Sequence, residues 1–277
     1  MKKVNWKKNS FWLMIAFIML IVFGKCTSTK LSDPSKIKIG VGETIITLSN
    51  PEKSQKYSST YSVKRLKKIM KIDGNWNKAQ WRSVKAIELT HYMGQIPPFH
   101  PTVHAKMMYD NDNLYIIFRV HDCYVRSIIE EYNGPVSTDA CVEFFFSPDT
   151  SLPERYFNLE INAGGTPLMA YHIFQQKEYQ KLSVEDLKKI EIAHSLPKKV
   201  DPEIVTPISW TVEYKLPLSV LEKFSSVTKP KPGVIWRANF YKTASKSSNP
   251  HYLTWSPVKN LVPNFHLPQF FGTIKFK

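Results

Sequence analysis

The stretch DACVEFFFSPD, Asp139–Asp149, predicts a strand at the centre of a hydrophobic core. Successive side chains of a strand point to opposite faces, so this stretch has one apolar face and one mixed face. The apolar face consists of Val142, Phe144 and Phe146. The mixed face consists of Cys141, Glu143 and Phe145. Ser147-Pro148-Asp149 ends the strand, because proline has no N–H to donate to a sheet and Ser-Pro-Asp favours a turn.

Further strands are predicted on both sides of this one. They are Val103–Tyr109, Leu114–Val120, Tyr156–Ala163, Trp210–Leu216, Trp236–Thr243, His251–Trp255 and Phe271–Phe276. Short helical turns are predicted at Trp76–Trp81 and after the capping box Ser183–Asp186, through about Ile190. Strands at this spacing without long helices predict an all-β fold. We expect a two-sheet antiparallel β-sandwich, jelly-roll or immunoglobulin-like, with one or two short helices.

The chain of 277 residues carries a net charge of +15. Five of these charges are lysines among the first 25 residues, which contain no acidic residue. The other lysines are scattered, and no nucleic-acid-binding motif is present. The charge therefore predicts a soluble, basic surface with no nucleic-acid partner; attraction to anionic envelope surfaces or acidic polymers is the alternative.

The N-terminus resembles a bacterial lipoprotein signal. A lysine-rich start precedes the apolar run Phe11–Phe23, which is too short for a comfortable membrane span, and Cys26 follows. We expect a signal peptide over residues 1–25, an acylated Cys26 that anchors the chain to a membrane, and a tether over residues 26–60. An ordinary secretory signal or an uncleaved anchor remains open. The folded domain is expected over residues 61–277.

Strand alternation also places polar side chains together. If the core strands are neighbours, one polar surface collects Arg119, Glu143, Glu160, Asn162, Arg237 and Asn239. Carboxylates, amides and guanidinium groups suit hydrogen bonding to the vicinal hydroxyls of a sugar, and Trp255 could supply an aromatic platform. The alternative is a solvated outer face of the sandwich.

The order of eight motifs resembles carbohydrate-binding family 9 over Tyr61–Lys277. The motifs are IDGNWNKAQW, YDNDNLYIIFRVHD, TDACVEFFFSPD, YFNLEINAGGT, WTVEYKLPLSVL, WRANFYK, HYLTWSPV and FHLPQFFGTIKF. The resemblance implies a β-sandwich that binds an oligo- or polysaccharide. It also implies a partnership with a glycoside hydrolase, or a place in a small envelope lipoprotein.

The resemblance further implies a sugar held between two tryptophans. Glu143, Asn162 and Trp255 match the family's glutamate, asparagine and second tryptophan. Glu160 stands where the family has arginine, and the first tryptophan's place falls near Val136. Tyr124 or Tyr132 could compensate for that missing ring. We therefore expect a non-catalytic saccharide-binding lipoprotein of the bacterial cell envelope.

Other functions remain open at this point. Glu143 and Glu160 could be the acid/base pair of a glycoside hydrolase, or the chain could be a hydrolase-associated subunit. Met169 and His172 could ligate haem in an electron-transfer sandwich.

Two smaller sites are also open. No cofactor is expected, although Asp110, Asp112 and Asn113 could hold a structural calcium ion or form a polar hairpin turn. Cys123 and Cys141 are predicted to pair as a disulfide, because they lie at facing ends of two strands taken as neighbours.

Overall fold

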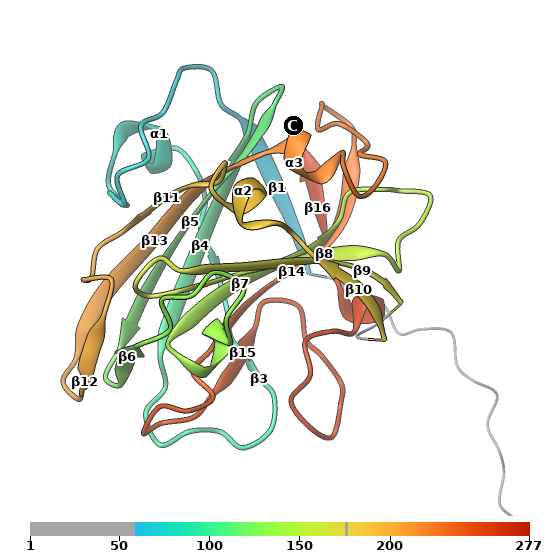
Figure 1. Ribbon diagram of the computed structural model, residues 1–277. Helices are drawn as coiled ribbons and strands as arrows, with labels where there is room; N and C mark the ends of the chain where they lie inside the picture. Colours follow the sequence, from blue (N-terminus) through green and yellow to red (C-terminus); the bar gives the residue numbers. More distant parts are fainter. Residues whose placement is uncertain (1–58, 175–176) are drawn as a thin grey trace, which may run out of the picture. The chain divides into compact units, whose positions relative to one another are not determined.

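The computed structural model describes residues 59–174 and 177–277. Cys26, the predicted signal peptide and nearly all of the predicted tether lie outside these residues. The described residues belong to one unit, Lys56–Lys277. Their regular secondary structure is almost entirely strands, joined by turns and loops, which confirms the all-β prediction (Figure 1).

The first sheet has the order β10-β9-β8-β7-β14-β16. Its strands are β10 (Glu178–Lys181), β9 (Pro167–Phe174), β8 (Tyr156–Asn162), β7 (Cys141–Ser147), β14 (Ile235–Thr243) and β16 (Gly272–Phe276). Two short strands, β15 (Tyr252–Thr254) and β3 (His91–Tyr92), extend it beyond β14. The strand quoted first in the sequence is thus β7, which pairs with β14 and β8.

The second sheet has the order β4-β5-β13-β11. Its strands are β4 (Thr102–Tyr109), β5 (Asn113–Asp122), β13 (Ile208–Pro217) and β11 (Glu191–His194), with β2 (Ile87–Glu88) beside β4. A small separate pair consists of β6 (Val125–Ser127) and β12 (Val200–Ile204). The predicted hairpin of β4 and β5 is confirmed.

Strand β1 (Thr60–Arg65) joins the two sheets. Its first part pairs with β16 and its last two residues pair with β4. Both pairings are parallel, so the sandwich departs from the fully antiparallel arrangement expected from the sequence. A strand that leaves one sheet for the other forms a corner of the sandwich.

The core lies between the two sheets, as the alternation in β7 predicts. Phe144 stacks near Phe146 and Phe240, with ring centroids 4.6 and 4.7 Å apart. Phe118 of the second sheet reaches Phe240 at 6.0 Å. These aromatic contacts bury large apolar surfaces from both sheets in one cluster, which stabilises the two-layer arrangement.

Helices within the described ranges are single turns. They are α1 (Ala79–Arg82), α2 (Val184–Leu187), α3 (Leu218–Leu221) and the 3-10 turns η1 (Val136–Thr138) and η2 (Pro268–Phe270). Ser183 caps α2 by accepting the N–H of Asp186, as its capping-box sequence predicts. Among the residues described here, no helix has the length and apolar character needed to cross a membrane.

Glu213 of β13 ties the segment that precedes α1 to the second sheet. Its buried carboxylate accepts hydrogen bonds from the backbone N–H groups of Asp73 and Gly74, from Lys78 Nζ and from Trp81 Nε1. Four donors satisfy a carboxylate that burial would otherwise make costly. This anchor explains why a lone turn of helix holds its position.

The predicted disulfide is wrong. Cys123 and Cys141 are both free thiols. Cys123 follows β5 of the second sheet, whereas Cys141 begins β7 of the first sheet. The prediction treated β5 and β7 as neighbours, but β5 pairs with β4 and β13.

The turn before β5 is held by its own hydrogen bonds. The carboxylate of Asp110 accepts from the backbone N–H groups of Asp112 and Asn113 and from the hydroxyl of Tyr115. These bonds lower the pKa of Asp110 against the effect of its burial. The polar-turn interpretation accounts for these residues, and calcium at this turn remains a prediction.

Candidate functional site

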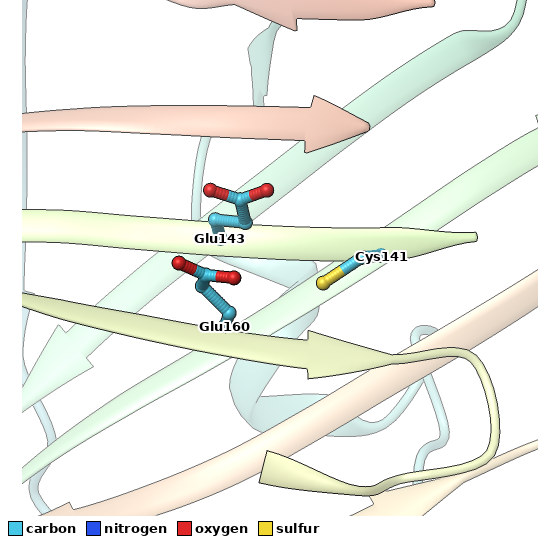
Figure 2. Close-up of side chains that lie close together, drawn as sticks. All are labelled: Cys141, Glu143 and Glu160. Carbon is cyan, nitrogen blue, oxygen red and sulfur yellow. The ribbon is translucent and has the colours of Figure 1, made fainter. Parts of the chain in front are cut away.

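The outer face of the first sheet is the floor of a groove. Glu143 of β7 and Glu160 of β8 lie directly opposite each other in the antiparallel register. Figure 2 shows their carboxylates beside each other, with Cys141 nearby on β7. The sequence alternation correctly placed Glu143 and Glu160 on one face.

This face is covered in part by a second aromatic cluster and is not a freely solvated surface. The cluster consists of Met93, Phe145, Tyr156, Tyr241, Phe265 and Phe271. Phe265 stacks on Tyr241 with ring centroids 4.1 Å apart and brings the C-terminal segment over the sheet. The packed rings and the 262–266 segment form a wall beside Glu143 and Glu160, and the space between this wall and the sheet is the groove.

Two adjoining cavities make up the groove. The first, about 410 Å³, is lined by Glu143, Glu160, Thr243, Tyr252 and the 262–266 segment. The second, about 500 Å³, is lined by Glu160, Asn158, His172, Tyr179 and Lys181. Ser137 of η1, Glu160 and His266 line both cavities. Volumes of this size suit one or two sugar rings.

The two carboxylates influence each other's ionisation. Burial, and then the negative charge of Glu160, raise the pKa of Glu143 well above its ordinary value. Burial raises the pKa of Glu160 to about 7. Side-by-side buried carboxylates resist double ionisation, so the pair retains a proton into the neutral range. The pair can thus both donate a hydrogen bond to a ligand and accept one.

An amide orients Glu160 from the side. Asn158 Nδ2 donates to Glu160 Oε1 at 2.8 Å, and Asn158 Oδ1 accepts from the N–H of Ala170 at 3.1 Å. His172 Nε2 lies 3.0 Å from the same amide oxygen and acts as its donor. Burial lowers the pKa of His172 to about 4, so the ring is neutral at physiological pH. Glu143 has no such support, and its buried Oε1 has no hydrogen-bond partner among the described residues.

Aromatic rings border the second cavity. His172 stacks on Tyr156 at 4.7 Å and on Tyr179 at 5.3 Å. Tyr179 is about half exposed, at 51%, and presents its ring to the groove. Tyr252 lines the first cavity. These two tyrosines supply aromatic surface that a sugar ring can contact.

Trp255 does not lie on this face, contrary to the predicted arrangement. It is 7% exposed and packs edge-on against Phe240 and Tyr61 in the core between the sheets. The backbone pairing gives the physical reason. Trp255 N donates to Phe240 O, which continues the pairing of β14 with β15 and sets Trp255 opposite Phe240. Residues opposite each other in a sheet share a face, so the indole lies on the core face with Phe240. The tyrosines named as substitutes for the first tryptophan also lie elsewhere. Tyr124 packs on Phe99, and Tyr132 packs against the main core.

Arg119 also lies elsewhere. It belongs to β5 in the second sheet, where its guanidinium lies 4.6 Å from the ring centroid of Trp76. A separate cavity of about 230 Å³ is lined by Arg119, Thr102, His104, His121 and Ser209. Alternation predicted the outer face correctly but could not tell which sheet it belonged to.

The other three predicted residues lie on the first sheet and are engaged locally. Arg237 donates to the backbone carbonyls of Phe271 and Gly272. Asn239 bonds to the backbone of Ser256 through both ends of its amide. Asn162 Nδ2 donates to Asp139 Oδ2 and Ile129 O, and its Oδ1 accepts the N–H of Thr166. Asn239 and Asn162 are fully buried.

The haem alternative does not fit the geometry. Met169 packs in the main core, whereas His172 lines the groove on the opposite face of β9. The two side chains therefore cannot ligate one metal centre together.

Comparison with known families decides the assignment. The model of the family "Carbohydrate-binding family 9" matches residues 69–276. This chain belongs to carbohydrate-binding family 9. The family 9 domain thus includes the groove, both sheets and the C-terminal wall.

Three solved structures resemble this family 9 domain. A Bacteroides uniformis protein described as carbohydrate-binding has a TM-score of 0.72 and 28% identity, over 79% of this chain and all of its own. A family 9 module from Caldicellulosiruptor kristjanssonii in complex with cellotriose has a TM-score of 0.54 and 18% identity, over 79% of this chain and 94% of its own. A family 9 module from the same organism in complex with glucose has a TM-score of 0.53 and 17% identity, over 79% of this chain and 96% of its own. No curated protein matches the chain.

Several groove residues were missed by the sequence analysis. Ser137, Tyr179, Tyr252 and His266 come from turns and edge strands, which carry no clear alternation. Asn158 shares a face with Glu160 two residues away, so its place was readable from the sequence.

Proposed function

We propose that this family 9 domain is a non-catalytic module that binds an oligo- or polysaccharide in the groove above Glu143 and Glu160. One observation carries the proposal: Glu143 lines the cavity, and its buried Oε1 has no hydrogen-bond donor from the described chain. A buried acceptor in this state is costly unless a ligand satisfies it. Sugar hydroxyls are suitable donors, and Tyr179 and Tyr252 offer aromatic surface for the C–H face of a sugar ring.

The placement of the carboxylates supports binding over hydrolysis. Glycosidases place their two carboxyl groups on either side of the bond that breaks. Glu143 and Glu160 lie side by side on one floor, with carboxylate oxygens within 4.8 Å of each other. Both groups would face the same side of a sugar, which suits hydrogen bonding to adjacent hydroxyls.

We further propose that the module is displayed on the bacterial cell envelope as a lipoprotein. The charged and apolar leader, followed by Cys26, supports this placement. A glycoside hydrolase that acts on the same polysaccharide is the expected partner. Mass spectrometry of the membrane fraction should find an acylated Cys26 as the first residue, and an intact Met1 would contradict the lipid anchor.

The saccharide proposal is tested by a glycan array on the full-length protein, followed by calorimetry with the sugar identified. Glu143→Gln should weaken binding by about 1.5–3 kcal/mol, because an amide cannot replace the carboxyl group that shares one proton and one negative charge with Glu160. Glu88→Gln is the matched control, since Glu88 is exposed on the second sheet and lies outside the groove. An array with no binding, or equal affinity in Glu143→Gln and the unmodified protein, would contradict the proposal.

A further inference from the structure

We propose that Cys141, Glu143 and Glu160 form a site for a divalent transition metal, with Zn²⁺ as the best match. One ligand atom of each residue lies within 4.8 Å of the others (Figure 2). Three atoms at that spacing leave a point no more than about 2.8 Å from each, against Zn–S distances of about 2.3 Å and Zn–O distances of about 2.0–2.2 Å. Side-chain shifts of about 0.5–0.8 Å would bring all three ligand atoms to these distances.

A second observation points to a ligand at this place. Glu143 is 2% exposed, and its Oε1 lacks a hydrogen-bond partner in the described part of the chain. The buried ammonium of Lys242 does not serve it, because that group is bonded to Thr243 O and to His251 Nε2. A buried carboxylate without a donor needs a proton, a cation or a metal ion.

The donor set selects the kind of metal. Calcium and magnesium take oxygen ligands alone, whereas Zn²⁺ accepts thiolate and carboxylate together. Cys141 is fully buried and lies two residues before Glu143 on the same face of β7. Glu160 is oriented by Asn158 Nδ2, which donates to its Oε1 at 2.8 Å.

The metal would be accessible from the groove. Glu143 and Glu160 line the first cavity, so an ion between them has an open position facing that space. Water or a ligand hydroxyl can occupy this position. The metal site goes beyond saccharide binding and does not depend on it, because the ion is held by the chain's own residues.

The experiment is a Co²⁺ titration of the reduced, metal-stripped full-length protein. A thiolate–cobalt charge-transfer band should appear in the near ultraviolet and disappear when Zn²⁺ is added. Cys141→Ser should abolish the band, and Glu160→Gln should weaken Co²⁺ binding by more than about tenfold. Cys123→Ser is the matched control, because Cys123 follows β5 of the other sheet and should leave the band intact.

Two outcomes would overturn the metal site: no charge-transfer band in the unmodified protein, or a band that persists in Cys141→Ser. Circular dichroism checks the fold of each variant, and Glu160→Gln provides the test if Cys141→Ser does not fold. The titration contains no sugar, so its result is separate from the glycan array. If the metal-stripped protein still binds the saccharide and shows no charge-transfer band with Co²⁺, the metal site is overturned and the saccharide proposal stands.

Discussion

Replacing Trp255 by alanine tests whether this ring is part of the core or part of the binding surface. The indole is 7% exposed, and its ring centroid lies 5.7 Å from that of Phe240 and 6.5 Å from that of Tyr61. A tryptophan buries about 150–250 Å², which at about 25 cal/mol per Å² corresponds to about 4–6 kcal/mol. Measured truncations of buried aromatic residues cost about 3–5 kcal/mol. We expect Trp255→Ala to lower the free energy of unfolding by about 3–5 kcal/mol.

Urea unfolding followed by circular dichroism measures this loss. Phe174→Ala is the control, because Phe174 is 56% exposed and its removal should change the unfolding free energy by less than about 0.5 kcal/mol. A Trp255→Ala variant of unchanged stability that has lost its saccharide affinity would refute the placement of Trp255 in the core. It would restore the sugar-platform role expected from the sequence.

Three other substitutions test the core, the buried charges and the groove. Gly272→Ala should lower the melting temperature, because a Cβ there would lie 2.7 Å from a ring carbon of Trp255 and 2.7 Å from the backbone oxygen of Ser59. An unchanged melting temperature in thermal unfolding would contradict this packing. Lys242→Met should cost about 3–5 kcal/mol in urea unfolding, since it leaves the buried carboxylate of Asp122, 3.5 Å away, without a counter-charge; adding Asp122→Asn should recover part of the loss. Burial raises the pKa of Glu160 from 4.5 to about 7, so the native state keeps a proton that the unfolded chain releases. The stability from this group is present below pH 4.5 and is lost as the pH rises through about 7, by up to roughly 3 kcal/mol, and Glu160→Gln should reduce this slope in unfolding curves recorded across that range, leaving the part that comes from the raised pKa of Glu143.

Much of the fold follows from alternation in single strands. The pattern in Val142, Phe144 and Phe146 identified the core face, and the same rule placed Glu143 and Glu160 together on the outer face. Such predictions succeed because strand geometry is local and the period of two is fixed. The site floor needed only this rule and the adjacency of β7 and β8, which are consecutive strands joined by residues 148–155.

The partner of a strand is not a local property, which explains the misplaced arginine. Arg119 faces outward as predicted, but β5 pairs with β4 and β13, so it faces outward from the other sheet. The same missing information produced the incorrect disulfide. The groove walls could not be predicted from local sequence either. The 262–266 segment is held over the sheet by long-range ring contacts such as Phe265 on Tyr241.

The misplaced tryptophan has a different cause. Leu253 and Trp255 are two residues apart in an extended segment, so alternation alone puts both on one face. Leu253 is fully buried, and the indole of Trp255 lies in the same core. The sugar-platform role of Trp255 came from the family resemblance, whereas strand alternation by itself predicts the buried position that the structure shows. A resemblance transfers a fold more safely than it transfers the role of one side chain.

The two most deeply buried glutamates of the described chain show how structure and function separate. Glu213 is fully buried and accepts four hydrogen bonds from the segment before α1 and from α1 itself. Its carboxylate is therefore satisfied within the chain, and the residue stabilises the fold. Glu143 is equally remote from water but keeps an oxygen without a donor beside a cavity. Leaving a buried polar group without a partner costs stability, and apolar side chains could have filled this part of the sheet. The chain therefore retains at Glu143 a polar group that a molecule or ion from outside can satisfy.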